Sequence, residues 1–283
     1  MRIFQKVNDL RAHIQKQKEL GMSIGFVPTM GALHQGHLSL VQRSKNECDL
    51  TIASIFVNPT QFNNTNDFNK YPRTTETDSQ QLMQTHCDIL FLPRVVEMYA
   101  HPLLDIAPLE IGYLDTILEG AMRPGHYQGV ATIVEKLLLS VLPDRMYLGL
   151  KDFQQVKVIE KLVSDRKMPI KIVGCPTLRE DNGLAMSSRN MRLSYEGKQK
   201  AGDIHQALEY IYKNLSIDSP ELAIAKAKDF ILSKGYWELE YLELRNAKDL
   251  SEIDLQLWQQ DAVYVALFAG WLEQVRLIDN ISF

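Results

Sequence analysis

Short apolar runs alternate with helical patterns through the first 176 residues of the chain. The apolar runs resemble strands of a buried parallel sheet, and they are Met22–Val27, Leu50–Val57, Asp88–Leu92, Arg145–Leu148 and Ile170–Cys175. The helical patterns between them are Leu38–Glu47, Glu76–His86, Val130–Val141 and Phe153–Ser164. This alternation predicts an α/β fold, a Rossmann-like doubly wound parallel sheet with right-handed crossovers. Ligands of such sheets bind at the carboxyl ends of the strands.

The alternation stops after Pro176. Two helical patterns follow, Tyr195–Leu215 and Pro220–Ser233, and then three strand-like runs, Glu238–Leu244, Ala262–Ala269 and Val275–Ile278. Helices followed by strands are typical of an α+β domain with a small antiparallel sheet. We therefore expect two domains, a Rossmann-like domain over residues 1–176 and a smaller α+β domain over residues 177–283.

Charge and cysteine usage exclude several classes of protein. The net charge of −4 argues against a general nucleic-acid binder, which is normally basic. The three cysteines are too widely spaced for a disulfide framework or a metal knuckle. The first residues contain no apolar signal segment, and no apolar run approaches the roughly 20 residues that span a bilayer. We expect a cytoplasmic protein with neither nucleic-acid nor membrane partners.

Two histidines follow the first of these apolar runs and precede a helix. The segment from Pro28 to His37 contains Gly31, His34 and Gly36 and reads His-x-Gly-His at its end. Backbone N–H groups of a glycine-containing turn and of a helix N-terminus attract anions, and histidines can donate hydrogen bonds to phosphate. This pattern resembles the signature of the nucleotidylyltransferase superfamily. A metal site and a polar loop without ligand are the alternatives, and a zinc site would need further ligands nearby.

Two amide side chains follow the next apolar run. Asn58 and Gln61 can both donate and accept hydrogen bonds, which suits a small substrate with hydroxyls and a carboxylate. A polar turn around Pro59 is the alternative. Further along the chain, Arg123 and His126 lie in a glycine-rich segment and either contact a ligand or support the loop.

A lysine occupies an electrostatically unfavourable place before the Phe153–Ser164 helix. Lys151 stands at the helix start, where the helix dipole disfavours a cation, and a bound phosphate would offset that cost. Gln155 lies on nearly the same helix face as Asp152. A capping box of Asp152 and Gln155 explains those two residues but not Lys151.

A Ser-Ser-Arg sequence follows the boundary between the domains. Ser187, Ser188 and Arg189 place hydroxyls and a guanidinium on one loop, which suits a triphosphate or pyrophosphate. The loop resembles the mobile phosphate loop of class I aminoacyl-tRNA synthetases, with arginine in place of lysine. For Ser188 alone, a role as helix N-cap is the alternative.

Six segments, in order and over essentially the whole chain, resemble the pantothenate synthetase (pantoate–β-alanine ligase) family of the nucleotidylyltransferase superfamily. They are PTMGALHQGHLSLV, FVNPTQFN, YPR, GAMRPGHYQGVATIV, YLGLKDFQQ and PTLREDNGLAMSSRN. The resemblance implies condensation of (R)-pantoate with β-alanine through a pantoyl-adenylate, with ATP as substrate and Mg²⁺ as cofactor and with release of AMP and pyrophosphate. It also implies a homodimer built through the N-terminal domains, and a second domain that closes over the site.

The resemblance assigns roles to individual residues. It makes His37 the principal catalytic histidine, with His34 and Lys151 beside it. It places pantoate at Gln61 and Gln155, with Asn58 nearby, and it implicates Asp88 in Mg²⁺ binding. Its ATP-binding residues are Met30, Gly31, Ala32, Leu33, His34, Gln35, Gly36, His37, Gly149, Leu150, Lys151, Asp152, Leu178, Met186, Ser187, Ser188 and Arg189.

Two positions depart from the family pattern. The family usually has a polar residue where this chain has Leu150, and Ile89 stands where some members place a second acidic group beside Asp88. Two other functions remain as alternatives. A nucleotidyltransferase would join a nucleotide to an acceptor without releasing AMP, and a non-catalytic nucleotide- or tRNA-binding module would lack the phosphate loop or carry a basic face.

Overall fold

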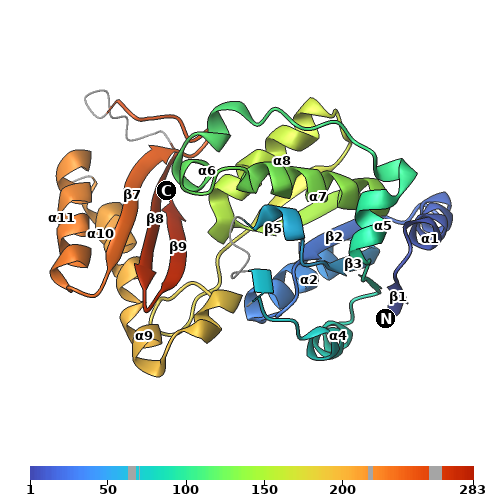
Figure 1. Cartoon of the computed structure of the whole chain (residues 1–283), viewed down its shortest axis with the longest axis horizontal. Helices are drawn as coiled ribbons and strands as arrows, with labels where there is room; N and C mark the ends of the chain where they lie inside the picture. Colours follow the sequence, from blue (N-terminus) through green and yellow to red (C-terminus); the bar gives the residue numbers. More distant parts are fainter. Residues whose placement is uncertain (63–67, 70, 216–218, 255–262) are drawn as a thin grey trace. The chain divides into compact units, whose positions relative to one another are not determined.

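The computed structural model describes residues 1–62, 68–69, 71–215, 219–254 and 263–283 (Figure 1). Contacts divide the chain into two units, the first formed by Met1–Leu150 with Gln154–Pro176 and the second by Lys151–Phe153 with Thr177–Phe283. Two residues of the segments considered above, Asn63 and Ala262, lie outside the described residues. Among the described residues, no helix is long and apolar enough to cross a membrane.

The first unit contains a parallel six-stranded sheet in the order β1-β4-β3-β2-β5-β6, which confirms the predicted α/β class. Its strands are β1 (Arg2–Phe4), β2 (Ile24–Thr29), β3 (Leu50–Ile55), β4 (Ile89–Phe91), β5 (Arg145–Gly149) and β6 (Lys171–Cys175). β3 lies beside β2 and β4 lies beside β3. The next strand along the chain, β5, lies on the other side of β2. The strand order therefore reverses between β2 and β5, where doubly wound sheets bind ligands.

Helices cover both faces of this sheet (Figure 1). The helices are α1 (Val7–Glu19), α2 (Gln35–Glu47), α4 (Thr75–Gln84), α5 (Val95–Ala100), α6 (Leu118–Met122), α7 (His126–Val141) and α8 (Phe153–Asp165). Side chains alternate between the faces along each strand, so Phe26 packs toward α1, α7 and α8, whereas Val27 packs toward α2 and α4. Burial on both sides accounts for the continuously apolar strands of the sequence.

The second unit is an antiparallel sheet with helices packed against it, which confirms the predicted α+β class. Its strand order is β7-β8-β9. The elements are α9 (Tyr195–Lys200), α10 (Asp203–Asn214), α11 (Pro220–Ser233), β7 (Glu238–Asn246), β8 (Tyr264–Leu272) and β9 (Val275–Ser282). Apolar side chains of α10, α11 and the sheet form one core cluster.

The structure differs from the predicted elements at one helix and at four strands or helices that no sequence pattern predicted. The prediction of a single helix over Tyr195–Leu215 is wrong, because the helix is interrupted at Gly202, between α9 and α10. A Cβ at Gly202 would lie 2.6 Å from the carbonyl oxygen of Asn182, so the glycine lets the two backbones approach. Strand β1 and helices α1, α5 and α6 were not predicted from the sequence, and α1 buries only Val7, Leu10 and Ile14.

Candidate functional site

The segments with predicted chemistry follow four neighbouring strands of the parallel sheet. The His-x-Gly-His segment follows β2, and the Asn58–Gln61 segment follows the adjacent β3. On the other side of β2, Gly149 ends β5, and β6 leads into the segment that contains Leu178. Since all four strands are parallel, these segments leave the same edge of the sheet, around the point where strand order reverses.

A left-handed turn connects β2 to the histidines, and a buried carboxylate holds it. Gly31 and Ala32 have φ values of 82° and 49°. The backbone N–H groups of Ala32 and Leu33 donate to the carboxylate of Asp78 at 3.0 and 2.8 Å. Because Asp78 accepts both bonds, the N–H groups of Ala32 and Leu33 are occupied within the protein.

Asp78, which no sequence pattern identified as functional, lies on α4 and is only 1% exposed. The Thr74 hydroxyl donates a third hydrogen bond to the same carboxylate, at 3.1 Å. A left-handed conformation is unfavourable for a residue with a Cβ, so Ala32 needs such support. The available signal was an acidic residue on the buried face of an otherwise amphipathic helix.

The two histidines form a capping box at the start of α2. His34 Nδ1 accepts from the Gly36 N–H at 3.1 Å, and His37 Nδ1 lies 3.4 Å from the His34 N–H that it caps. The ring centroids are 4.1 Å apart. Because Nδ1 accepts a hydrogen bond in each neutral ring, the ring proton resides on Nε2. Both Nε2 atoms are thereby donors, which suits phosphate oxygens. Among the described residues, no group of three or more His, Cys, Asp or Glu side chains could hold a metal.

Asn58 orients Gln61 within the segment after β3. The Asn58 amide nitrogen donates to Gln61 Oε1 and to the Gly129 carbonyl, both at 3.1 Å. Its amide oxygen accepts from the Tyr99 hydroxyl at 2.6 Å and from Thr60. Burial raises the pKa of Tyr99, which keeps this hydroxyl protonated as a donor. The amide of Asn58 is therefore occupied within the protein, so the structure does not favour the predicted substrate contact by this residue.

Gln61 itself faces the segment after β2. Its Nε2 donates to the sulfur of Met30 at 3.0 Å, and a thioether is a weak acceptor. The carbonyl oxygen of Gln61 is 2.8 Å from His126 Nδ1, and Arg123 Nη1 lies 3.1 Å from His126 Nε2. Because a guanidinium can only donate, His126 accepts at Nε2 and donates to Gln61 from Nδ1. Of the two readings left open for Arg123 and His126, the geometry favours support of the loop.

Two consecutive glutamines of α8 have different environments. Gln154 is buried, accepts from the Glu119 N–H and donates to the carbonyls of Leu114 and Ile117. The Gln155 side chain is partly exposed and forms no hydrogen bond with another described residue. Gln155 is therefore the glutamine of this pair whose side chain is not bonded to another described residue, and its predicted contact with pantoate stays a prediction.

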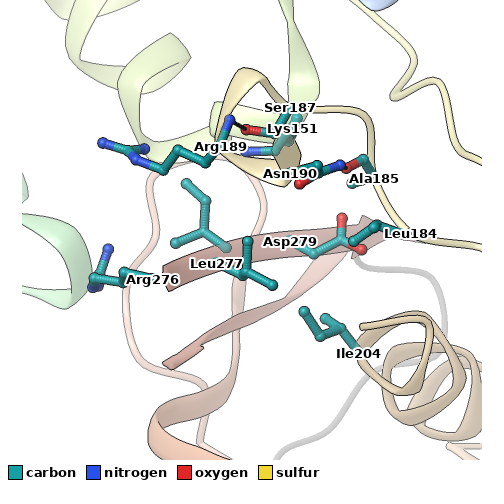
Figure 2. Close-up of a pocket in the computed structure, with 11 residues that line it drawn as sticks. Lys151, Leu184, Ala185, Ser187, Arg189, Asn190, Ile204, Arg276, Leu277 and Asp279 are labelled. Carbon is teal, nitrogen blue, oxygen red and sulfur yellow. Dashed lines mark hydrogen bonds between the residues drawn. The ribbon is translucent and has the colours of Figure 1, made fainter. Parts of the chain in front are cut away.

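A pocket in the second unit gathers three of the predicted phosphate-binding residues, Lys151, Ser187 and Arg189 (Figure 2). The view places them above Leu277 and Asp279 of β9. The other lining residues are Leu184, Ala185, Asn190, Ile204, Arg276 and Ile278. Lys151 Nζ lies 3.8 Å from the Asp152 carboxylate, and the side chain of Lys151 is 15% exposed. Cationic and hydroxyl side chains in one pocket suit phosphate oxygens.

Three other residues predicted to bind ATP do not line this pocket, namely Leu178, Met186 and Ser188. The N-cap of the following 3₁₀ turn, Ser188–Arg192, is Ser187, whose hydroxyl accepts from the Arg189 N–H at 3.2 Å. The alternative that Ser188 is an N-cap is therefore wrong. Arg276 and Asn190 line the pocket without having been identified in the sequence.

Asp88 lies at the amino ends of the sheet strands, opposite to the carboxyl ends that the histidine and amide segments follow. It precedes β4, and its carboxylate binds Lys45 Nζ at 2.9 and 3.0 Å. It also accepts from the Thr51 N–H at 2.8 Å, at the amino end of β3. These contacts do not favour the Mg²⁺-ligand role predicted for Asp88, because ligands gather at the carboxyl ends of the strands.

Comparisons with known proteins agree on one family. A family model described as pantoate-β-alanine ligase matches residues 2–282. A pantothenate synthetase from Cytophaga hutchinsonii is 47% identical over 277 residues, which cover 97% of this chain and 96% of the relative. The crystal structure of pantothenate synthetase from Thermus thermophilus matches with a TM-score of 0.90 at 39% identity and covers 99% of both chains. The structure of pantoate-β-alanine ligase from Francisella tularensis, complexed with β-γ ATP and β-alanine, has a TM-score of 0.75 at 36% identity and covers 99% of this chain and 97% of that one.

Replacing the buried carboxylate that holds the turn should loosen it. In Asp78→Asn, one oxygen becomes an amide N–H₂ that opposes a donor, so one buried bond is lost. We expect the free energy of unfolding to fall by about 1–3 kcal/mol and the amide protons of Ala32 and Leu33 to exchange faster with solvent. Denaturant unfolding and amide hydrogen exchange measure the two effects. Asp9→Asn, an exposed acidic residue in the first turn of α1, is the control. Equal behaviour of the two variants would contradict the role of Asp78.

Proposed function

The chain belongs to the pantoate-β-alanine ligase family, and from this membership we propose how its residues divide the reaction. The protein is an ATP-dependent ligase that joins (R)-pantoate to β-alanine. One observation supports the residue assignments. Four segments with predicted chemistry follow neighbouring strands, around the point between β2 and β5 where the strand order reverses. Nucleotide transfer to a different acceptor, the alternative considered from sequence, has no comparable support.

In the first step, a carboxylate oxygen of pantoate attacks the α-phosphorus of ATP. The new bond joins this oxygen to phosphorus, the bond to the bridging oxygen of the β-phosphate breaks, and pyrophosphate leaves with the electron pair. Negative charge spreads over the phosphoryl oxygens, so positioned donors accelerate the step. We assign this task to the Nε2–H groups of His34 and His37, with His37 as the principal catalytic residue.

Lys151, Ser187 and Arg189 are assigned to the phosphates of ATP, because they line one pocket. Arg189 can form paired bonds to phosphate oxygens, whereas Lys151 acts as a point charge. The remaining ATP contacts stay proposals that rest on the family resemblance. They comprise the segment from Met30 to Gln35 together with Gly36, and Gly149, Leu150, Asp152, Leu178, Met186 and Ser188.

Gln61 and Gln155 are assigned to pantoate. Both are neutral amides, which match hydroxyl and carboxylate oxygens and add no charge for a phosphate. Asn58 acts through Gln61, because it fixes the amide of that residue.

In the second step, the amine of β-alanine attacks the acyl carbon of the pantoyl-adenylate. The carbon–nitrogen bond forms, the bond from the acyl carbon to oxygen breaks, and AMP leaves with that oxygen, while the amine loses a proton to solvent. AMP is a good leaving group, so this step needs no strong base. Exclusion of water protects the adenylate from hydrolysis.

We propose that Mg²⁺ enters as part of the nucleotide substrate. Among the described residues, no acidic or histidine cluster is arranged to hold a resident ion. Mg²⁺ commonly keeps several waters and binds phosphate oxygens in such enzymes. The family resemblance also supports a homodimer and a cytoplasmic location, and sedimentation equilibrium measures the first of these.

Oxygen labelling tests the reaction itself. With pantoate labelled by ¹⁸O in its carboxylate, the proposed route transfers one labelled oxygen into AMP. We expect AMP formation to require both pantoate and β-alanine and the AMP mass to rise by the mass difference of one oxygen isotope. Mass spectrometry of the products measures both. Formation of ADP, or AMP without label, would contradict the adenylate route.

Removing the principal histidine should slow adenylation while the fold persists. In His37→Ala we expect single-turnover formation of pantoyl-adenylate to fall about 10²–10³-fold, as for other lost transition-state donors. Loss of the helix cap should cost stability by only about 1 kcal/mol. His13→Ala, on α1, is the matched control. Rapid quench with chromatographic separation measures the rate, and a near-normal rate in folded His37→Ala would rule out this assignment.

The two glutamines of α8 form a matched pair of tests. Gln155→Ala should leave the free energy of unfolding within about 0.5 kcal/mol of the parent and weaken pantoate binding roughly 5- to 150-fold. Gln154→Ala should instead destabilise the fold, because three backbone groups lose their partner. Calorimetric titration with pantoate and, separately, with ATP distinguishes the ligands. If Gln155→Ala weakens ATP binding as much as pantoate binding, Gln155 does not select pantoate.

A further inference from the structure

Strand β9 places an acidic residue and an amide in the interior of the second unit. Asp279 is 3% exposed and Asn280 is 6% exposed, and both follow the apolar residues Leu277 and Ile278 on the same strand. Buried polar side chains need partners within the protein. The partner of Asn280 is Lys151, which the proposed function assigns to the phosphates of ATP, and the partner of Asp279 is Arg179, which precedes the loop of Ser187 and Arg189.

Asn280 binds the backbone of Lys151. Its Nδ2 donates to the carbonyl oxygen of Lys151 at 2.7 Å, although the two residues are 129 positions apart. Lys151 lies in the 3₁₀ turn Leu150–Asp152, directly before α8. The bond fixes the peptide plane that follows Lys151, and with it the direction in which the lysine side chain leaves the backbone.

Asp279 holds the hairpin that leads to the phosphate loop. Its carboxylate receives two bonds from Arg179, at 2.6 and 3.1 Å. Arg179 also donates to the carbonyls of Gly183 and Asn280, at 3.0 and 3.2 Å. A backbone bridge pairs Arg179 with Ala185 and so closes the hairpin just before Ser187. The side chain of Arg179 therefore has a structural task in which both of its terminal nitrogens take part.

Among the described residues, Lys151 forms one ion pair, a long one of 3.8 Å from Nζ to the Asp152 carboxylate. A lysine has four side-chain carbons and much rotamer freedom, so its placement depends strongly on the backbone from which it starts. A shift of about 1 Å in a charge that acts on the reacting phosphate can cost about 10²-fold in rate.

We propose that Asn280 is a positioning residue, which sets Lys151 toward the pocket that also contains Ser187 and Arg189. Asp279, the adjacent residue, holds the hairpin before Ser187 and Arg189 through Arg179. Two consecutive residues of β9 thus fix both segments of the pocket relative to one strand. The proposal rests on the role of Lys151 given under the proposed function.

A double-mutant cycle tests the proposal. The variants are Asn280→Ala, Lys151→Ala and the two together, with single-turnover pantoyl-adenylate formation measured at saturating ATP and pantoate. Asn214→Ala is the matched control, since the Asn214 amide also donates to a backbone carbonyl in the second unit, that of Tyr210 at 2.8 Å. Denaturant unfolding of each variant measures the change in stability separately.

We expect Asn280→Ala to slow the step about 10- to 100-fold and Asn214→Ala to leave it near the parent rate. In the Lys151→Ala background, Asn280→Ala should cause no further slowing, because its effect passes through the lysine. Its effect on unfolding should persist in that background. An interaction that only stabilises the fold would not give this split between rate and stability.

The outcomes distinguish the role of Lys151 from the positioning role of Asn280. A normal rate in Lys151→Ala would overturn the proposed role of Lys151 itself. A slow Lys151→Ala together with an Asn280→Ala no slower than Asn214→Ala would overturn the positioning role alone. Equal slowing by Asn280→Ala in both backgrounds would also overturn it. If Asn280→Ala does not fold, Asn280→Asp keeps the side-chain size, removes the donor and enters the same cycle.

Discussion

The pairing of β2 with β3 on one side and with β5 on the other is the constraint on which the first unit depends. This arrangement reverses the strand order and lets the segments after adjacent strands leave one edge of the sheet. Apolar residues pack against both faces of the sheet. The polar chemistry therefore lies beyond the strand ends, where a change of side chain does not disturb the core packing.

The sequence allowed prediction of features that depend on local pattern. Buried parallel strands are continuously apolar, so β2, β3, β5 and β6 were recognisable, and so were the segments that follow them. The partners of these segments were not recognisable, because no local pattern shows which distant residue will accept a hydrogen bond. Asp78 lies 46 positions from Ala32, and Asn280 lies 129 positions from Lys151. Only the folded chain brings either pair together.

Residue type also proved easier to predict than residue role. Asn58 and Gln61 were both recognised as amides that can bind small polar ligands. In the structure, however, Asn58 holds the side chain of Gln61 in place. The difference arises because the side-chain amide of Asn58 forms hydrogen bonds with Tyr99 and Gly129, which belong to other parts of the sequence. Gln154 and Gln155 show the same division between neighbours on one helix.

The hold of Asp78 on the turn after β2 means that the His-x-Gly-His segment is not a self-contained module. The turn that contains its two left-handed residues is stabilised by a carboxylate that belongs to another helix, whereas its histidines cap their own. A designer who transplanted only the segment and its flanking strand and helix into a new sheet would bring the donors without their acceptor. The smallest portable unit therefore includes α4, and grafts that omit it would need a carboxylate supplied by the host scaffold.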